Sequence, residues 1–207
     1  MSDADELGLP AHAFERQDEG ADLGFYAPPR LVTHIDEHAV AALSGFYQDI
    51  IPASGRVLDL MSSWVSHLPD DIAYDVVGHG MNVDELAANP RLARWFVQDL
   101  NRETTLPEPD ASFDAVLVCV GVQYLQRPLT VLREVRRVLR PGGAVVVSFS
   151  NRCFPTKAVA VWRALGTDGH AALVRLYLEK AGFAEVAPHV LADGRGSDPL
   201  VAVAGRA

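Results

Sequence analysis

The stretch that decides the fold is residues 112–151, SFDAVLVCVGVQYLQRPLTVLREVRRVLRPGGAVVVSFSN. Two apolar runs, at 113–120 and 142–150, enclose a segment whose apolar residues recur at helical spacing. That segment carries arginines toward its end and stops at Pro-Gly-Gly, as helices commonly do. Runs that are apolar throughout are typical of parallel strands buried on both faces. The stretch therefore predicts a strand, a one-turn segment, an amphipathic helix and a second, parallel strand.

The pattern extends in both directions along the chain. Upstream, Asp36 is a good N-cap for a helix that Pro52 ends. Three more apolar strands are predicted between that helix and residue 112, at 56–61, 74–80 and 94–100. Downstream, two helical segments precede two strands separated by a GRGSDP turn; they are 156–166, 167–183, 184–193 and 200–206. The order predicts an α/β fold of three α/β/α layers, with a mostly parallel seven-stranded sheet and an antiparallel C-terminal hairpin.

Composition excludes several classes of function. The 207 residues are 49% apolar and 22% charged, which is typical of one globular domain, and the formal charge of −9 disfavours nucleic acid and anionic membranes as partners. The first ten residues lack a basic and apolar leader, and no apolar run is long enough to span a membrane, so a cytoplasmic protein is expected. Cys119 and Cys153 have no metal-ligand spacing and predict no disulfide.

The block at 106–151 resembles the class I S-adenosylmethionine (SAM)-dependent methyltransferases, in particular their small-molecule group, and the resemblance extends over residues 54–205. It implies a Rossmann-like fold, SAM as cofactor and methyl transfer to a small-molecule acceptor. Residues 36–207 then form one methyltransferase-like domain, and the acidic, Gly-dotted residues 1–35 form an extension, loose or lid-like, over its site.

The resemblance also implies a cofactor site, which this sequence alters. Asp59 matches the family's acid after the first strand, but Met61, Ser63 and Val65 stand where the family has glycines, so the turn must follow a different path. Gly80 stands where a carboxylate accepts the ribose hydroxyls. Asp99 matches the acid that binds adenine. The cofactor-binding residues expected are Asp59, Met61, Ser62, Ser63, Gly80, Met81, Asn82, Asp99, Leu100 and Cys119.

Three interpretations of these altered turns stay open. Asn82 is either a helix cap only or also a substitute for the missing ribose acceptor. His67 and His79 either replace lost contacts or pack. Residues 64–68 are a candidate helix start with Trp64 facing the sheet, which would point backbone N–H groups at the cofactor's carboxylate.

Five residues are candidates for acting on the acceptor. They come from the N-terminal segment and from the ends of the fourth and fifth strands, and they are His34, His38, Tyr124, Asn151 and Arg152. Arg152 either orients an anionic acceptor or pairs with a neighbouring acid. His34 and His38 lack a third ligand, so no metal site is expected.

Two functions remain open: a SAM-dependent methyltransferase, and a methyltransferase-like binding or regulatory protein that has lost turnover. A nicotinamide-cofactor enzyme is disfavoured, because no G-x-G-x-x-G follows the first strand.

Overall fold

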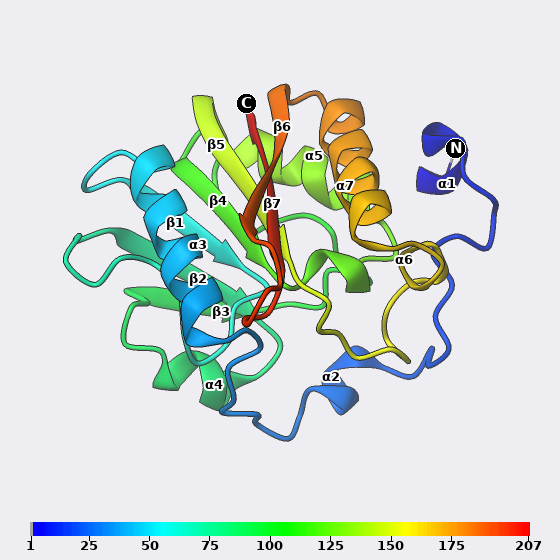
Figure 1. Ribbon diagram of the computed structural model, residues 1–207, viewed down its shortest axis with the longest axis horizontal. Helices are drawn as coiled ribbons and strands as arrows, with labels where there is room; N and C mark the ends of the chain where they lie inside the picture. The colour runs from blue at the N-terminus through cyan, green and yellow to red at the C-terminus, as the bar shows by residue number, and fades with distance from the viewer. Residues whose placement is uncertain (1) are drawn as a thin grey trace.

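The computed structural model describes residues 2–207. Its centre is a seven-stranded sheet in the order β3-β2-β1-β4-β5-β7-β6, in which β7 runs antiparallel to the other six strands (Figure 1). The strands are β1 (Arg56–Leu60), β2 (Asp75–Gly80), β3 (Arg94–Val97), β4 (Phe113–Cys119), β5 (Leu139–Phe149), β6 (Ala184–Ala192) and β7 (Leu200–Arg206). The α/β fold class and the C-terminal hairpin predicted from the sequence are confirmed.

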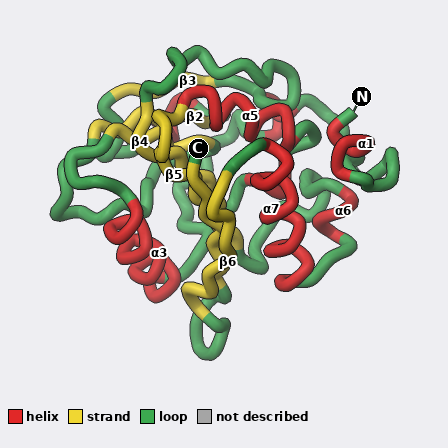
Figure 2. Tube along the Cα trace, turned by 90° about the horizontal axis from the view of Figure 1, so that it is seen from above, coloured by secondary structure: helices red, strands yellow, loops and turns green. Residues whose placement is uncertain are grey.

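Helices cover both faces of this sheet, so the central strands are buried on both sides (Figure 2). On one face α3 (Glu37–Ile50) contributes Leu43 to the smaller core, to which Val57 and Val146 of the sheet also belong. On the other, α5 (Pro128–Val138) and α7 (Thr167–Ala181) form the larger core with the strand residues that face them. Burial of alternate residues in opposite layers explains why the central strands are nearly continuous apolar runs.

The remaining helices are short. They are α1 (Asp3–Leu7), α2 (Asp22–Phe25), α4 (Val83–Ala88), the single 3-10 turn η1 (Val122–Tyr124) and α6 (Ala160–Arg163). The predicted N-caps Asp36 and Asn82 both accept a hydrogen bond, from the Ala39 and Glu85 N–H groups. The helix expected over 156–166 is reduced to α6. None of the helices in residues 2–207 combines the length and the apolar character that crossing a membrane requires.

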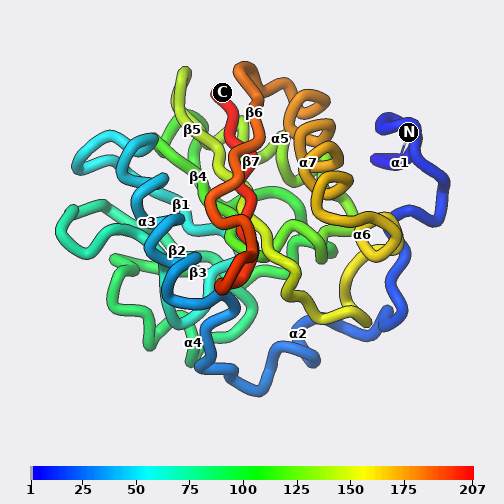
Figure 3. The backbone as a smooth tube through the Cα atoms, viewed as in Figure 1, coloured from blue at the N-terminus to red at the C-terminus, as the bar shows by residue number. Residues whose placement is uncertain are grey.

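The N-terminal segment is packed rather than loose. It runs from α1, beside α5 and α7, past α2 beneath the sheet to α3 (Figure 3). Leu7 and Phe14 belong to the larger core, and the buried Asp3 carboxylate accepts the Leu129 N–H at 2.7 Å. The expectation of a loose N-terminus is wrong, because these apolar side chains have a core to join. Whether the segment acts as a lid stays a proposal.

No helix follows β1, so the candidate helix at 64–68 is wrong. The segment is a loop that side chains hold: Asn89 donates to the Ser63 carbonyl at 2.9 Å, and the Trp64 indole N–H donates to the Val32 carbonyl at 3.0 Å. Pro69 also disfavours helical geometry for the residue before it. Leu68 still packs in the smaller core, whereas Trp64 contacts the N-terminal segment rather than the sheet.

Candidate functional site

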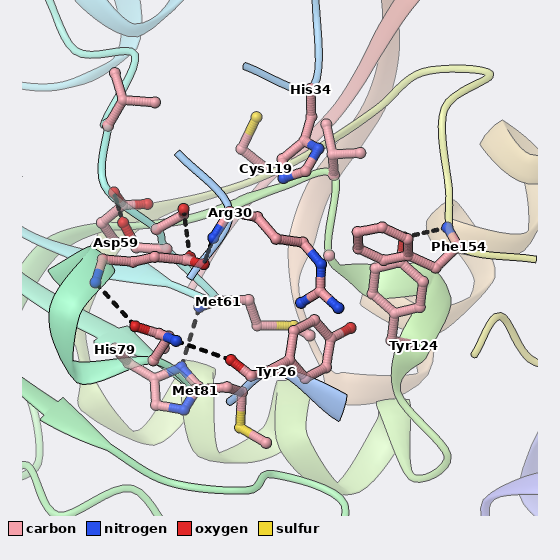
Figure 4. A pocket seen from close by; sticks show the side chains of 18 of the residues that line it. Tyr26, Arg30, His34, Asp59, Met61, His79, Met81, Cys119, Tyr124 and Phe154 are labelled. Carbon is pink, nitrogen blue, oxygen red and sulfur yellow. Dashed lines mark hydrogen bonds between the residues drawn. The ribbon is translucent and has the colours of Figure 1, made fainter. Parts of the chain in front are cut away.

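A pocket of about 420 Å³ lies over the carboxyl ends of β1 to β5 and is lined on one side by the N-terminal segment (Figure 4). Parallel strands of an open α/β sheet bring their carboxyl ends to one edge, which is where such folds place ligands. The topology therefore explains why residues spread over more than 130 positions in sequence meet here.

The structure brings most of the expected residues together around this pocket. All ten residues expected at the cofactor line it, namely Asp59, Met61, Ser62, Ser63, Gly80, Met81, Asn82, Asp99, Leu100 and Cys119. Of the five acceptor candidates, four also line it, namely His34, Tyr124, Asn151 and Arg152. His38 is exposed on α3 and does not line the pocket.

Asp59, the residue before the last of β1, is a buried carboxylate with two hydroxyl partners. Its Oδ2 accepts from Ser62 Oγ at 2.6 Å and from Ser66 Oγ at 2.5 Å. Burial raises the pKa of Asp59, and the two serine hydrogen bonds oppose that shift. The serines of the altered turn therefore bind the acid side chain.

Met61 keeps one feature of a glycine turn. Its φ is +61°, the left-handed conformation that favours glycine, whereas Ser63 and Val65 do not have positive φ. The Met61 N–H donates to Nδ1 of His79 at 3.0 Å, and the Ser62 N–H donates to the His79 carbonyl at 2.6 Å. That the turn follows a different path from the family's glycine turn stays a prediction. Both of these N–H groups point to β2.

His79 is the residue around which the turn is built. It is only 1% exposed, and its Nε2 lies 2.8 Å from the Gln98 carbonyl while Nδ1 accepts the Met61 N–H. These partners require a proton on Nε2 and none on Nδ1, the neutral ring. Burial lowers the pKa of His79 to about 4, in agreement with that state. His79 thus packs and also fixes the turn, and that it replaces a lost cofactor contact stays a prediction.

Gly80 is glycine because the turn occupies the space beside it. A Cβ at this position would lie 2.6 Å from the Ser62 carbonyl oxygen and 3.1 Å from Leu86 Cδ2. No side chain fits without moving the backbone of the turn. The turn after β1 and the glycine after β2 therefore fit together sterically.

Both ends of the Asn82 side-chain amide form hydrogen bonds within the protein. Oδ1 caps α4, and Nδ2 donates to the carbonyls of Tyr26 and Ala27, both at 2.9 Å. Its role in the structure is to cap a helix and fasten the N-terminal segment. In this conformation it has no free N–H for a ligand.

Glu85, which the sequence analysis missed, is the carboxylate of α4 that lines the pocket. Its Oε2 accepts from Ser63 Oγ and its Oε1 from the Arg30 N–H, each at 2.7 Å. The sequence signal that could have identified Glu85 is its place three residues after the Asn82 cap. The first turn of a helix lies at the same end of the sheet as the end of the strand before it.

Asp99 follows β3 and keeps a free carboxylate oxygen. Oδ1 accepts the Asn101 N–H at 3.0 Å, and Oδ2 has no partner within residues 2–207. The Asn101 side chain in turn donates to Asp22 and to the Tyr124 carbonyl. This network holds the loop after β3 against the loop after β4.

The acceptor candidates differ in what they can do. Arg152 pairs with Asp198 at 2.9 Å, so the alternative of pairing with an acid is the one observed, although Arg152 also lines the pocket. Tyr124 Oη accepts the Phe154 N–H at 2.9 Å, and burial raises its pKa to about 12, so its hydroxyl is neutral at pH 7. Burial lowers the pKa of His34 and raises that of the Cys119 thiol to about 12.

Comparison with known proteins agrees with this geometry. The family model described as "Methyltransferase domain" matches residues 59–147, from the end of β1 into β5. The demethylmenaquinone methyltransferase of Beutenbergia cavernae is 34% identical over 95 residues, which are 45% of this chain and 40% of that protein. This chain therefore spans less than half of that relative's length.

Solved structures show the fold. A SAM-dependent methyltransferase from Archaeoglobus fulgidus superposes with a TM-score of 0.62 at 14% identity, over 81% of this chain and 93% of that one. This chain is similar to methyltransferases over residues 59–147 and has the fold of the SAM-dependent methyltransferases. The [4+2]-cyclase SpnF also superposes, with a TM-score of 0.59 at 15% identity over 89% of each chain, so the methyltransferase fold alone does not fix the reaction.

SAM is the cofactor of the methyltransferases that this chain resembles, and the pocket can be tested for groups that would hold it. The resemblance places adenine at Asp99, which has a free oxygen and lines the pocket together with Leu100. It places the ribose at Gly80, and Glu85 is a carboxylate of the helix that follows, α4, which also lines the pocket. At the methionine end, the N–H groups of Met61 and Ser62 are already bonded. The residues fit the adenosine part and require new contacts for the rest.

Proposed function

We propose that this chain is a SAM-dependent methyltransferase that acts on a small-molecule acceptor. The observation that carries the proposal is one continuous pocket that joins Asp99, after β3, to Tyr124 and Asn151, after β4 and β5. Asp99 would hold the adenine of the cofactor, and Tyr124 and Asn151 would line the space left for an acceptor.

Methyl transfer from SAM requires few catalytic side chains. Bound SAM would supply an activated methyl group on a positively charged sulfur for in-line transfer to the acceptor. This chain then has to hold the acceptor in line and exclude water. The N-terminal segment closes one side of the pocket through Tyr26 and His34 and is fastened there by Asn82. His34, with its pKa lowered by burial, is the candidate base for an acceptor that carries a proton.

The small-molecule character of the acceptor is supported by the size of the pocket and by the named activity of the Beutenbergia relative, whose acceptor is demethylmenaquinone. A chamber of about 420 Å³ lies in the range typical of small-molecule sites.

Calorimetric titration with S-adenosylhomocysteine (SAH) tests the cofactor part. We expect binding by the unmodified protein and a loss of about tenfold or more in Asp99→Asn, which removes one carboxylate oxygen but keeps an acceptor for the Asn101 N–H. Asp84→Asn is the control, because Asp84 is exposed on α4 outside the pocket. No heat and no thermal shift at millimolar SAH would refute the proposal.

A second candidate function is a methyltransferase-like binding or regulatory protein without turnover. It is favoured by the engaged Met61 and Ser62 N–H groups and by the filled space at Gly80. Binding of SAH that Asp99→Asn abolishes, together with transfer of radiolabelled methyl from SAM to any of a panel of phenols, quinols and amines, argues against it. If neither SAH binding nor methyl transfer is observed, the second candidate function is supported.

A further inference from the structure

Arg30 places a positive charge at the centre of the pocket. Its N–H donates to Glu85 and its Nη2 donates to the Phe25 carbonyl at 2.9 Å, so the side chain is held at both ends. Figure 4 shows the guanidinium reaching from the N-terminal segment to the space between Met61 and the rings of Tyr124 and Phe154. Arg30 is thus fixed at a point where a ligand would meet it.

The guanidinium has no counter-ion. Its Nη1 is buried and has no hydrogen-bond partner within residues 2–207, and none of the ion pairs in that range includes Arg30. The nearby buried cations behave differently: Arg16 and Lys157 both pair with the carboxylate of Asp22. Glu85 binds the main-chain N–H of Arg30 rather than its guanidinium. A buried donor on a charged group is costly when it is left unpaired, so this atom is suited to a ligand.

Aromatic rings surround the same charge. The guanidinium carbon lies 4.7 Å from the ring centre of Phe25, 5.3 Å from that of Phe154 and 5.8 Å from that of Tyr26. Phe154 stacks at 6.0 Å on Tyr124, whose neutral hydroxyl keeps a proton to donate. Flat walls favour a planar ligand, and the fork of guanidinium donors matches a carboxylate.

We propose that Arg30 and the rings of Tyr26, Tyr124 and Phe154 form the acceptor subsite, and that the acceptor is a planar unsaturated molecule bearing a carboxylate or another anionic oxygen that pairs with Arg30 Nη1. The inference rests on the proposed function. The proposed subsite places the anion beside Tyr124 and Phe154, which follow β4 and β5. This position is away from Asp99, where the adenine is expected. The other source of a carboxylate at this point is SAM itself, so the experiment separates the two.

The first arm measures the anion. Benzoate and its neutral analogue benzamide are titrated, with and without saturating SAH, and followed by NMR line shifts. We expect benzoate to bind at least about tenfold more tightly than benzamide, and Arg30→Gln to remove that preference while Arg30→Lys retains part of it. Arg175→Gln removes one charge from α7 outside the pocket lining and should leave the preference intact. Equal binding of benzoate and benzamide by the unmodified protein, or an unchanged preference in Arg30→Gln, overturns the proposal.

The second arm separates the acceptor from the cofactor. SAH and 5′-methylthioadenosine, which lacks the cofactor's carboxylate, are titrated into the unmodified protein and into Arg30→Gln. We expect both affinities to change by less than about twofold. A tenfold loss for SAH alone would assign Arg30 to the cofactor's carboxylate and overturn the proposal. If the unmodified protein does not bind SAH, the proposed function fails, and the benzoate arm without SAH still decides the role of Arg30.

Discussion

At the scale of single residues, contacts among the substituted residues determine the shape of the site. Comparison with the family motif shows only that the expected residues are missing. Met61 and Gly80 depart from the family pattern, yet together with Ser62 they form one unit around His79. The sequence showed that both turns depart from the family pattern. It did not show that a backbone carbonyl occupies the space beside Gly80, because main-chain paths over irregular loops leave no periodic signal.

Gly80 provides the test at this scale. Gly80→Ala should lower the free energy of unfolding by about 1–3 kcal/mol, because the new Cβ meets the Ser62 carbonyl at 2.6 Å. Gly80→Asp, which restores the family's acid, should destabilise at least as much and should not improve SAH affinity. Urea unfolding measures the first effect and calorimetry the second.

Gly45→Ala is the matched control. Gly45 lies exposed within α3 with no atom within 4 Å of an added Cβ, so alanine there should stabilise the protein by about 0.5–1 kcal/mol. Equal stability of Gly80→Ala and the unmodified protein would contradict the steric argument.

At the scale of elements, the strands and long helices were predictable and the short connections were not. Strands β1, β2, β4 and β5 are buried on both faces over most of their length and therefore have nearly continuous apolar sequences. A helix was wrongly predicted in the connection after β1, because Trp64, Val65 and Leu68 have apolar spacing compatible with a helix. Serine side chains that bind Asp59 stabilise the loop instead, and such contacts cannot be read from spacing.

The connection from β2 to α4 allows a test at the element scale. Asn82→Asp keeps the cap oxygen for α4 but replaces both donors to Tyr26 and Ala27 by an acceptor. We expect hydrogen exchange of residues 22–35 to accelerate while α4 stays protected. Asn82→Ala removes the cap as well, so α4 should also exchange faster. Unchanged exchange over 22–35 in Asn82→Asp would show that the amide does not hold the segment.

At the scale of the whole molecule, burial around the pocket couples stability to pH. Burial lowers the pKa of His79 and of His67 to about 4, whereas an exposed histidine titrates near 6.5. Between about pH 4 and pH 6.5, these two histidines bind protons in the unfolded chain but stay neutral in the folded chain. Stability is therefore complete above about pH 6.5 and is lost as the pH falls toward 4. The raised pKa of Asp59 acts in the opposite direction, since the folded protein takes up that proton first.

The expected loss attributable to His79 is up to about 3 kcal/mol between pH 6.5 and 4, since each unit of pKa difference corresponds to about 1.4 kcal/mol. His79→Gln keeps an acceptor for the Met61 N–H and a donor for the Gln98 carbonyl without a titrating ring. Urea unfolding at a series of pH values should thus give a shallower acid loss in His79→Gln than in the unmodified protein. Gly45→Ala should shift the stability curve without changing its slope. A stability that stays level from pH 6.5 to 4.5 in the unmodified protein, or an equal slope in His79→Gln, would show that the neutral histidine does not hold the turn, because protonation of Nδ1 must break its bond to Met61.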